Sequence, residues 1–214
     1  MKRRDIIAGA SGLVLGSVAG CLGVVGMDEH EASPAGVDPD VRDETGYEQT
    51  NVDELVVRES FEAAGISEEI TVRNFLTEHE KSIDLGPIGS VQAAAFMILT
   101  SPQISIAGRE LNPIEEMSSD ELIELIEADF DGISNVNHVS DGDVAILDQE
   151  TTESVFEADA EFEGRAVDVY IHISESVQTA DDHLVTIGVY PELVEDVERG
   201  NIETLRDNVV ENAE

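Results

Sequence analysis

Apolar and polar residues alternate most regularly between Val155 and Glu163. Aromatic and small apolar side chains occupy one phase of this stretch and carboxylates occupy the other, which is the period of two shown by a half-buried strand. The apolar phase holds Phe156, Ala158, Ala160 and Phe162. The alternation resumes over residues 167–174 after Gly164 and Arg165, so the two stretches are predicted to form an antiparallel hairpin.

Further strands are predicted on both sides of this hairpin. Residues 55–64 and 70–81 predict a long hairpin around Gly65, and residues 184–190 alternate as a later strand. Residues 91–100 are apolar in both phases, which is typical of a central strand covered on both faces.

Two segments carry helical signals instead. Ser118 and Glu121 form a capping box before apolar positions at helical spacing, namely Leu122, Leu125, Ile126 and Phe130. A last helix is predicted to begin at Asn201, with Pro191 opening a short helical turn before it. Strands and helices do not alternate regularly, so the pattern predicts an α+β fold: an antiparallel sheet with the helices packed on one face.

The first residues have the pattern of an export signal. Arg3 and Arg4 precede an apolar stretch that ends at Gly20, which predicts a signal peptide over residues 1–20 with cleavage after Gly20. The apolar stretch rises only about 22 Å as a helix, less than the roughly 30 Å hydrocarbon core, so a permanent transmembrane anchor is not expected. The arginine pair resembles a twin-arginine signal, and general secretion is the alternative.

Cys21 is the only cysteine of the chain. The run Val18-Ala19-Gly20-Cys21 resembles a lipobox, so we expect a lipid on Cys21 to hold the protein at the extracellular face of the cell membrane. A plain cleaved signal with an incidental cysteine is the alternative. A single cysteine excludes an internal disulfide, a cysteine zinc site and an iron–sulfur cluster.

The charge is strongly acidic. The chain has 48 Asp and Glu against 11 Lys and Arg, a net charge of −37, yet 41% of its residues are hydrophobic. Such self-repulsion opposes folding at ordinary ionic strength, whereas the Debye length of about 3 Å in 1 M salt screens it. We therefore predict the surface of a halophilic protein. A polyanionic surface also argues against nucleic acid as a partner.

Domain boundaries follow from composition. The stretch after Cys21 is rich in acidic residues, glycine and proline and shows no sustained periodicity, so residues 21–46 are predicted to be the lipidated cysteine and a flexible tether. Residues 47–214 are enough for a single domain with its own core.

Several segments together resemble a group of haloarchaeal lipoproteins of unknown function. They are Cys21-Leu22-Gly23 with the acidic stretch after it, residues 107–113, Asp181-Asp182-His183 and Tyr190-Pro191-Glu192. The resemblance covers most of the mature chain and implies a cell-surface address, a two-chain ether lipid on Cys21 and a shared fold, but no activity. The order of strands and helices is also similar to PsbP-like domains, which are accessory or assembly subunits on membranes. This second likeness is architectural and carries little information on function.

Candidate chemistry is sparse. The chain contains no nucleophile elbow, zinc helix, phosphate loop or dinucleotide fingerprint, so neither a cofactor nor a metal site is expected. The four histidines of the body, His79, His138, His172 and His183, have no metal-binding spacing and are interpreted as solvated surface.

Three further polar segments are candidates for binding. The clusters Asp141-Gly142-Asp143 and Asp181-Asp182-His183 are interpreted as turns rather than cation sites. Arg109 follows Gly108 in a chain with few basic residues, so it is a candidate anion contact, with a local carboxylate as the alternative partner.

These patterns favour a lipid-anchored cell-surface protein whose domain is a non-enzymatic binding or accessory module. Its expected partners are the membrane, through Cys21, and an envelope protein or small ligand. The alternative is a secreted hydrolase whose Ser, His and Asp residues are scattered in sequence. The solute-binding component of a transporter is disfavoured because two lobes around a cleft need a longer chain.

Overall fold

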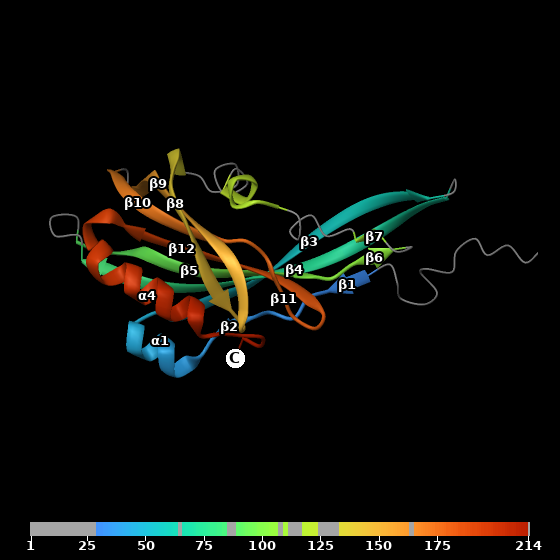
Figure 1. Ribbon diagram of the computed structural model, residues 1–214, viewed down its shortest axis with the longest axis horizontal. Coiled ribbons are helices and arrows are strands. Elements are labelled where there is room, and N and C mark those ends of the chain that lie inside the picture. The colour runs from blue at the N-terminus through green and yellow to red at the C-terminus, as the bar shows by residue number, and fades with distance from the viewer. Residues whose placement is uncertain are drawn as a thin grey trace, which may run out of the picture.

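A nine-stranded, mostly antiparallel sheet organises the protein (Figure 1). The computed structural model describes residues 29–63, 66–84, 89–106, 109–110, 117–123, 133–162 and 165–213. The strands of the sheet are β1 (Glu29–Glu31), β3 (Glu48–Ala63), β4 (Ile66–Asp84), β5 (Ser90–Pro102), β8 (Ile133–Ile146), β9 (Gln149–Phe162), β10 (Arg165–Ser174), β11 (Val177–Gln178) and β12 (Asp182–Pro191). Their order is β1-β4-β5-β12-β10-β9-β8, with β3 paired to β4 and β11 paired to β12.

Two small ladders complete the strands. β2 (Gly36–Val37) pairs with β13 (Val209–Val210), and β6 (Ser105–Ile106) pairs with β7 (Arg109–Glu110). The described helices are α1 (Pro39–Thr45), the 3-10 turn η2 (Glu192–Val194), α4 (Glu195–Asp207) and a segment over residues 119–123. In the part of the chain that the structure describes, no helix is long and apolar enough to cross a membrane.

The predicted hairpins and central strand are confirmed. β9 and β10 pair antiparallel with Phe162 opposite Arg165, and Ala158 and Ala160 of β9 are buried while Glu157 is exposed. β3 and β4 form the long antiparallel hairpin, and β5 lies between β4 and β12. The predicted turn residues Gly65 and Gly164 lie outside the described residues.

Helices cover both faces of the sheet, so the prediction that they pack on one face is wrong. α1 and α4 lie on one side, where Ile202 and Leu205 of α4 join the core, and the segment 119–123 lies on the other (Figure 1). There Leu122 and Ile123 join a second core that includes Phe156. The reason is that the central strands carry apolar side chains in both phases, and each face needs a cover.

α4 begins earlier than predicted. It starts at Glu195 instead of Asn201, and η2 after Pro191 is the short helical turn that the sequence predicted. The early turns were missed because Glu198, which is only 3% exposed, occupies a buried position with a charged side chain. The helix also lies very close to β12, since a Cβ atom at Gly188 would come within 2.6 Å of Ile202 Cγ2.

The predicted tether is wrong from residue 29 onward, because this segment is folded into the domain. β1 pairs parallel with β4, and Val37 in β2 pairs with Val209. α1 has a complete set of local signals: the Asp38 carboxylate accepts from Asp40 N at 2.9 Å, Pro39 is its first residue, and Gly46 closes it with a φ of 77°. A helix of seven residues is too short for a periodic pattern, and the packing of α1 against α4 exists only in the tertiary structure.

Candidate functional site

An open pocket of about 270 Å³ lies where β8 and β9 meet the helical segment 119–123. Its described lining residues are all polar: Ser118, Ser119, Asp120, His138, Asp141, Thr152, Ser154 and Glu175. They come from four separate stretches of the chain, so only folding brings them together.

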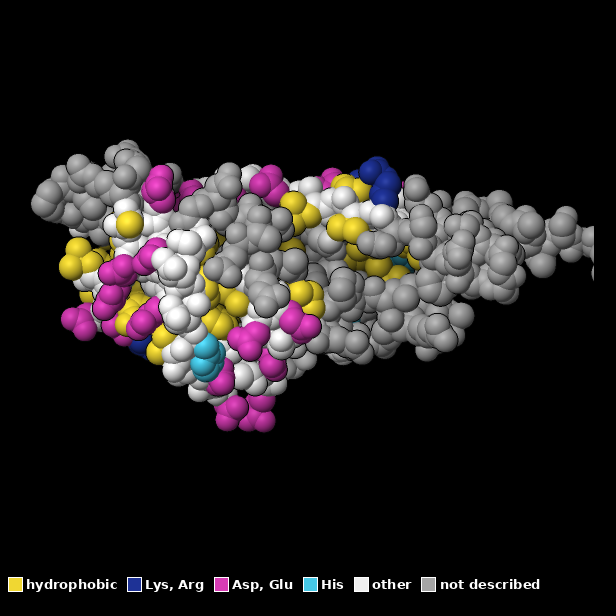
Figure 2. All heavy atoms as spheres, turned by 90° about the horizontal axis from the view of Figure 1, so that it is seen from above, with side chains coloured by type: hydrophobic (Ala, Val, Ile, Leu, Met, Phe, Trp, Pro, Cys, Tyr) yellow, Lys and Arg dark blue, Asp and Glu magenta, His cyan; other side chains and the backbone are white. Residues whose placement is uncertain are grey.

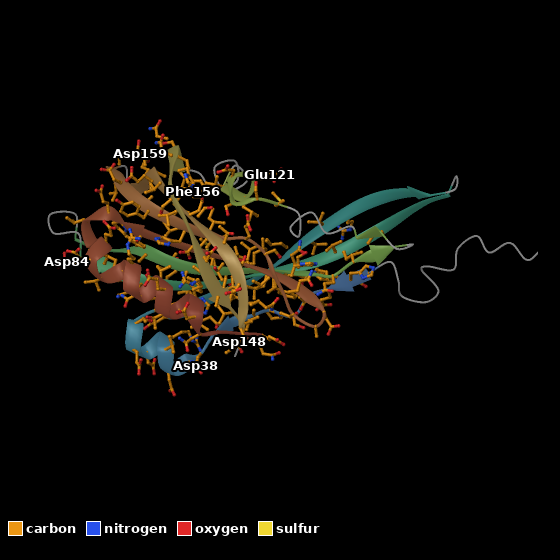
Figure 3. All side chains as sticks on the ribbon, viewed as in Figure 1. Asp38, Asp84, Glu121, Asp148, Phe156 and Asp159 are labelled. Atoms are coloured by element: carbon orange, nitrogen blue, oxygen red, sulfur yellow. The ribbon has the colours of Figure 1, made fainter. Side chains whose placement is uncertain are left out.

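The helical wall is fixed by the predicted capping box, which is confirmed. Ser118 N and Ser118 Oγ donate to Glu121 Oε2 at 2.9 and 3.0 Å, and Glu121 N donates back to Ser118 Oγ at 3.4 Å. The bonds from the backbone and side chain of Ser118 lower the pKa of the Glu121 carboxyl. Figure 3 shows Glu121 on the same side of the sheet as Phe156 of β9, against whose core Leu122 and Ile123 pack. The capped first turn thereby places Ser119 and Asp120 at the pocket.

The strand wall carries a hydrogen-bonded cluster of three side chains. His138 Nε2 donates to Asp141 Oδ1 at 2.7 Å, and Ser154 Oγ donates to the same oxygen at 2.7 Å. The His138 ring also meets Phe156 edge-on, with ring centroids 5.5 Å apart and an interplanar angle of 77°. The bond from His138, followed by that from Ser154, lowers the pKa of the Asp141 carboxyl. Asp141 is therefore a carboxylate whose neighbours hold it in place.

A β-bulge creates this cluster. Residues three apart on a regular strand point to opposite faces, but the β8–β9 register shifts between His138 and Ser140. As a result His138 lies opposite Phe156 and Asp141 lies opposite Ser154, and these two β9 positions share a face. The sequence interpretation of Asp141 as a turn residue is wrong, since it lies within β8. The interpretation of His138 as exposed is confirmed, because 44% of its side chain is accessible.

Ser119 provides a second kind of group at the pocket. The residue is only 4% exposed, and its hydroxyl has no hydrogen-bond partner among the described residues. A buried unsatisfied hydroxyl costs roughly 1–3 kcal/mol, so native proteins rarely keep one without a use. A molecule in the pocket that bonds this hydroxyl would recover that cost.

The order of the cluster decides what chemistry it supports. In a serine-type triad the histidine lies between the hydroxyl and the carboxylate, so that the imidazole takes the hydroxyl proton. Here the Asp141 carboxylate lies between Ser154 and His138, and Ser154 donates to the acid. Across the described ranges, no group of three or more His, Cys, Asp or Glu residues is arranged to hold a metal ion. The arrangement suits hydrogen bonding to a ligand.

A different polar cluster lies buried beneath α4, and we call Glu153, His172, Tyr190 and Arg206 the buried network. His172 Nδ1 donates to Glu153 Oε1 at 3.1 Å, Tyr190 Oη donates to His172 Nε2 at 2.9 Å, and Arg206 Nη1 donates to Glu153 Oε2 at 3.1 Å. None of the four is more than 7% exposed. Burial alone would raise the pKa of Glu153, but the bond from His172, together with the charge of Arg206 and its bond, outweighs burial and lowers this pKa.

Three of the four body histidines are buried, which corrects their interpretation as solvated surface. His79, His172 and His183 are 0%, 2% and 2% exposed. Burial lowers the pKa of His79 to about 4, although a bond to Phe96 O opposes the shift. His79 and His172 sit in polar phases of their strands, and the sequence did not reveal that α1 and α4 cover that face.

The segment Asp181-Asp182-His183 is a turn in part, as predicted. Thr179 N donates to Asp182 O at 2.8 Å, and Asp182 N donates to Thr179 Oγ1 at 2.9 Å. The Asp182 carboxylate is only 5% exposed and accepts from Ser33 N at 2.9 Å, while burial raises its pKa. It therefore anchors the N-terminal segment to the sheet.

The remaining predicted site residues are not placed. Arg3, Arg4, Gly20 and Cys21 lie outside the described residues. Arg109 has its backbone in β7, opposite Ile106, but its side chain is outside the described part.

Comparison with known families gives one match. The model of a domain of unknown function, DUF6517, matches residues 34–210. The chain belongs to the DUF6517 family. This agrees with the expectation of a family of unknown function, and no curated protein matches the chain. The DUF6517 match starts inside the predicted tether and ends in β13, so it includes α1 and the β2–β13 ladder as well as every pocket residue.

Proposed function

We propose that this DUF6517 protein is a non-enzymatic binding module that is held at the cell surface by a lipid on Cys21 and takes a small polar ligand in the pocket. One observation carries the binding role: the pocket brings the unpartnered, buried hydroxyl of Ser119 together with a preformed His138–Asp141–Ser154 cluster. A volume of about 270 Å³ is near the lower end for ligand pockets, roughly 300–1,000 Å³, which favours a small molecule.

The lining indicates the charge of that ligand. It offers the carboxylates of Asp120, Asp141 and Glu175 together with hydroxyls and one imidazole, and its described lining includes no Lys or Arg. An anionic ligand would meet repulsion there, whereas a polyol or a protonated amine can donate to the carboxylates. The proposed class is therefore a neutral or cationic molecule rich in hydrogen-bond donors.

The proposed location rests on the sequence and on the surface. Figure 2 shows acidic side chains distributed over the face in view, with Lys and Arg at few places. This fits the net charge of −37 and a working medium of concentrated salt. The same proposal includes export through the twin-arginine-like pair Arg3 and Arg4 and cleavage after Gly20. It also includes the resemblance to haloarchaeal lipoproteins and the PsbP-like order of elements.

A hydrolase is the second candidate, because the pocket does join a histidine to hydroxyl groups. The bonding order speaks against it, since neither Ser154 nor Ser119 is bonded to His138 among the described contacts. Turnover of ester or glycoside substrates that disappears in His138→Ala would favour the hydrolase over the binding module.

Ligand binding can be tested on the protein in concentrated salt. A panel of polyols, diamines and carboxylic acids is titrated while the imidazole resonances of His138 are followed by NMR. We expect shifts with polyols or amines, no shift with the acids, and weaker binding in Ser119→Ala. Ser134→Ala, a change of an exposed serine of β8 away from the pocket, is the control. Absence of a shift with every class would contradict the proposal.

The anchor needs its own experiment. Cys21→Ser should move the protein from the membrane fraction to the soluble fraction, while Ser11→Ala in the same signal should leave it on the membrane. Retention of Cys21→Ser on the membrane would show that a lipid on this residue is not what holds the protein.

A further inference from the structure

The β3–β4 hairpin extends away from the helices as an arm (Figure 1). Within the described residues β3 pairs only with β4, while β5 and β1 occupy the other side of β4. No other described strand occupies the outer edge of β3, so its backbone donors and acceptors can pair with a strand that approaches.

This edge is also apolar. Residues 51–58 are exposed in both phases of the strand, and four of the seven large exposed hydrophobic residues found in the described structure lie here. They are Val52, Leu55, Val56 and Val57, at 38 to 41% exposure. Proteins usually protect such edges with proline, a bulge or charged side chains. Residues 51–63 of β3 have no proline, lysine or bulge, and the charged side chains among residues 51–58 include both signs.

The charges of the edge are complementary to those of a second copy. When two copies of β3 pair about a two-fold axis normal to the sheet, each face of one sheet continues into the same face of the other. Residues of the same strand phase must therefore lie opposite one another. With the axis at Val56, Leu55 faces the partner's Val57, and Glu54 faces the partner's Arg58. Shifting the axis to Leu55 or Val57 removes the Glu54–Arg58 pairing. Basic residues number only 11 in the chain, so an arginine at this spacing is informative.

The arm already holds Glu54 in place for this contact. Arg73 of β4 forms ion pairs with both Glu54 and Glu29. A partner's Arg58 would add a second cation to a carboxylate that is about 41% exposed. On the opposite face of the sheet, Leu55 of each copy would contact Val57 of the other. These apolar side chains would lie next to Val72 of β4, which is opposite Val57.

We infer that the β3 edge is a self-association surface, through which two copies pair antiparallel about Val56 and join their sheets. The register also sets Asp53 opposite the partner's Glu59, and both bodies are strongly acidic, so association should strengthen as salt rises.

A cysteine crosslink tests the register directly. In the full chain with Cys21→Ser, Val56→Cys supplies the only thiol, and the two Val56 positions would lie opposite each other with Cβ atoms about 4.5–5.5 Å apart. We expect a disulfide-linked dimer on mild oxidation in concentrated salt. Val52→Cys is the control: it is equally exposed and in the same phase, but its two copies would be separated by about 27 Å along the pair.

Two further measurements complete the test. Sedimentation of Cys21→Ser in concentrated salt should give the mass of a dimer, and Arg58→Glu, which sets two carboxylates against each other, should give a monomer with unchanged circular dichroism. A monomer for Cys21→Ser, or equal crosslinking of Val52→Cys and Val56→Cys, would overturn the inference.

Discussion

The pocket and the buried network use the same kinds of side chain on neighbouring strands, yet the structure gives them opposite physical conditions. Each contains a histidine bonded to a carboxylate: His138 with Asp141 in the pocket and His172 with Glu153 in the network. The second pair is 2% and 9% accessible, whereas the first is 44% and 57% accessible. In the network α4 covers the pair, and the charged groups of Glu153 and Arg206 are hydrogen-bonded to each other. In the pocket the pair stays open, and a nearby hydroxyl lacks a partner. The difference separates groups that hold the fold from groups available to a ligand.

The largest loss of stability is expected when a charged partner is removed from the buried network. Arg206→Met removes the guanidinium bonded to Glu153 and leaves a buried carboxylate with His172 alone. We expect the free energy of unfolding to fall by about 3–5 kcal/mol in denaturant titrations. Arg199→Met is the control, because its pair with Glu195 is exposed and should contribute no more than about 0.5 kcal/mol. Equal losses would mean that burial does not distinguish these two ion pairs.

Acid should destabilise the protein through the buried His79. The pKa of His79 falls from 6.5 to about 4 on folding, so between these values the unfolded state binds the additional proton. Stability is therefore complete above pH 6.5 and declines as the pH falls toward 4, by on the order of 3 kcal/mol. His79→Leu should flatten this part of the stability–pH profile. An unchanged slope in His79→Leu would rule out this origin.

Because α4 packs so closely against the sheet, a larger residue at Gly188 should cause a smaller loss of stability. Gly188→Ala places a Cβ atom within 2.6 Å of Ile202 Cγ2, so the helix must shift, and we expect about 1–3 kcal/mol of destabilisation. Gly200→Ala in the same helix has no atom within 4 Å and should stabilise the protein by about 0.5–1 kcal/mol. Thermal unfolding of the two variants measures whether each change lowers or raises stability. A stable Gly188→Ala would show that α4 does not seal the network tightly.

The pocket should give the smallest changes in stability. Ser119→Ala removes an unpartnered hydroxyl, so the free energy of unfolding should stay the same or rise by up to about 1 kcal/mol. Ser154→Ala breaks a bond to Asp141 and should cost about 1 kcal/mol. Denaturant titration compares them. A clear loss in Ser119→Ala would mean that its hydroxyl stabilises the fold.

Local sequence signals predicted much of the fold. Strict alternation located β9 and β10, and the Ser118–Glu121 capping box gave the start of a helix, because both depend on neighbours within a few residues. The pocket was not predictable in the same way. Its His138–Asp141 pair depends on a bulge in β8, and a bulge adds a residue without leaving a recognisable pattern.

The alternating strands, the capped helix start, the acidic surface and the single cysteine can all be read from the amino-acid sequence. Each is a property of residue types and short spacing. Four features follow only from the assembled fold: α1 belongs to the domain, helices cover both faces, His79 and His172 are buried, and Ser119 and Asp141 line one pocket. These outcomes depend on contacts between residues far apart in the chain. Their burial and bonding energies exist only once the sheet has assembled.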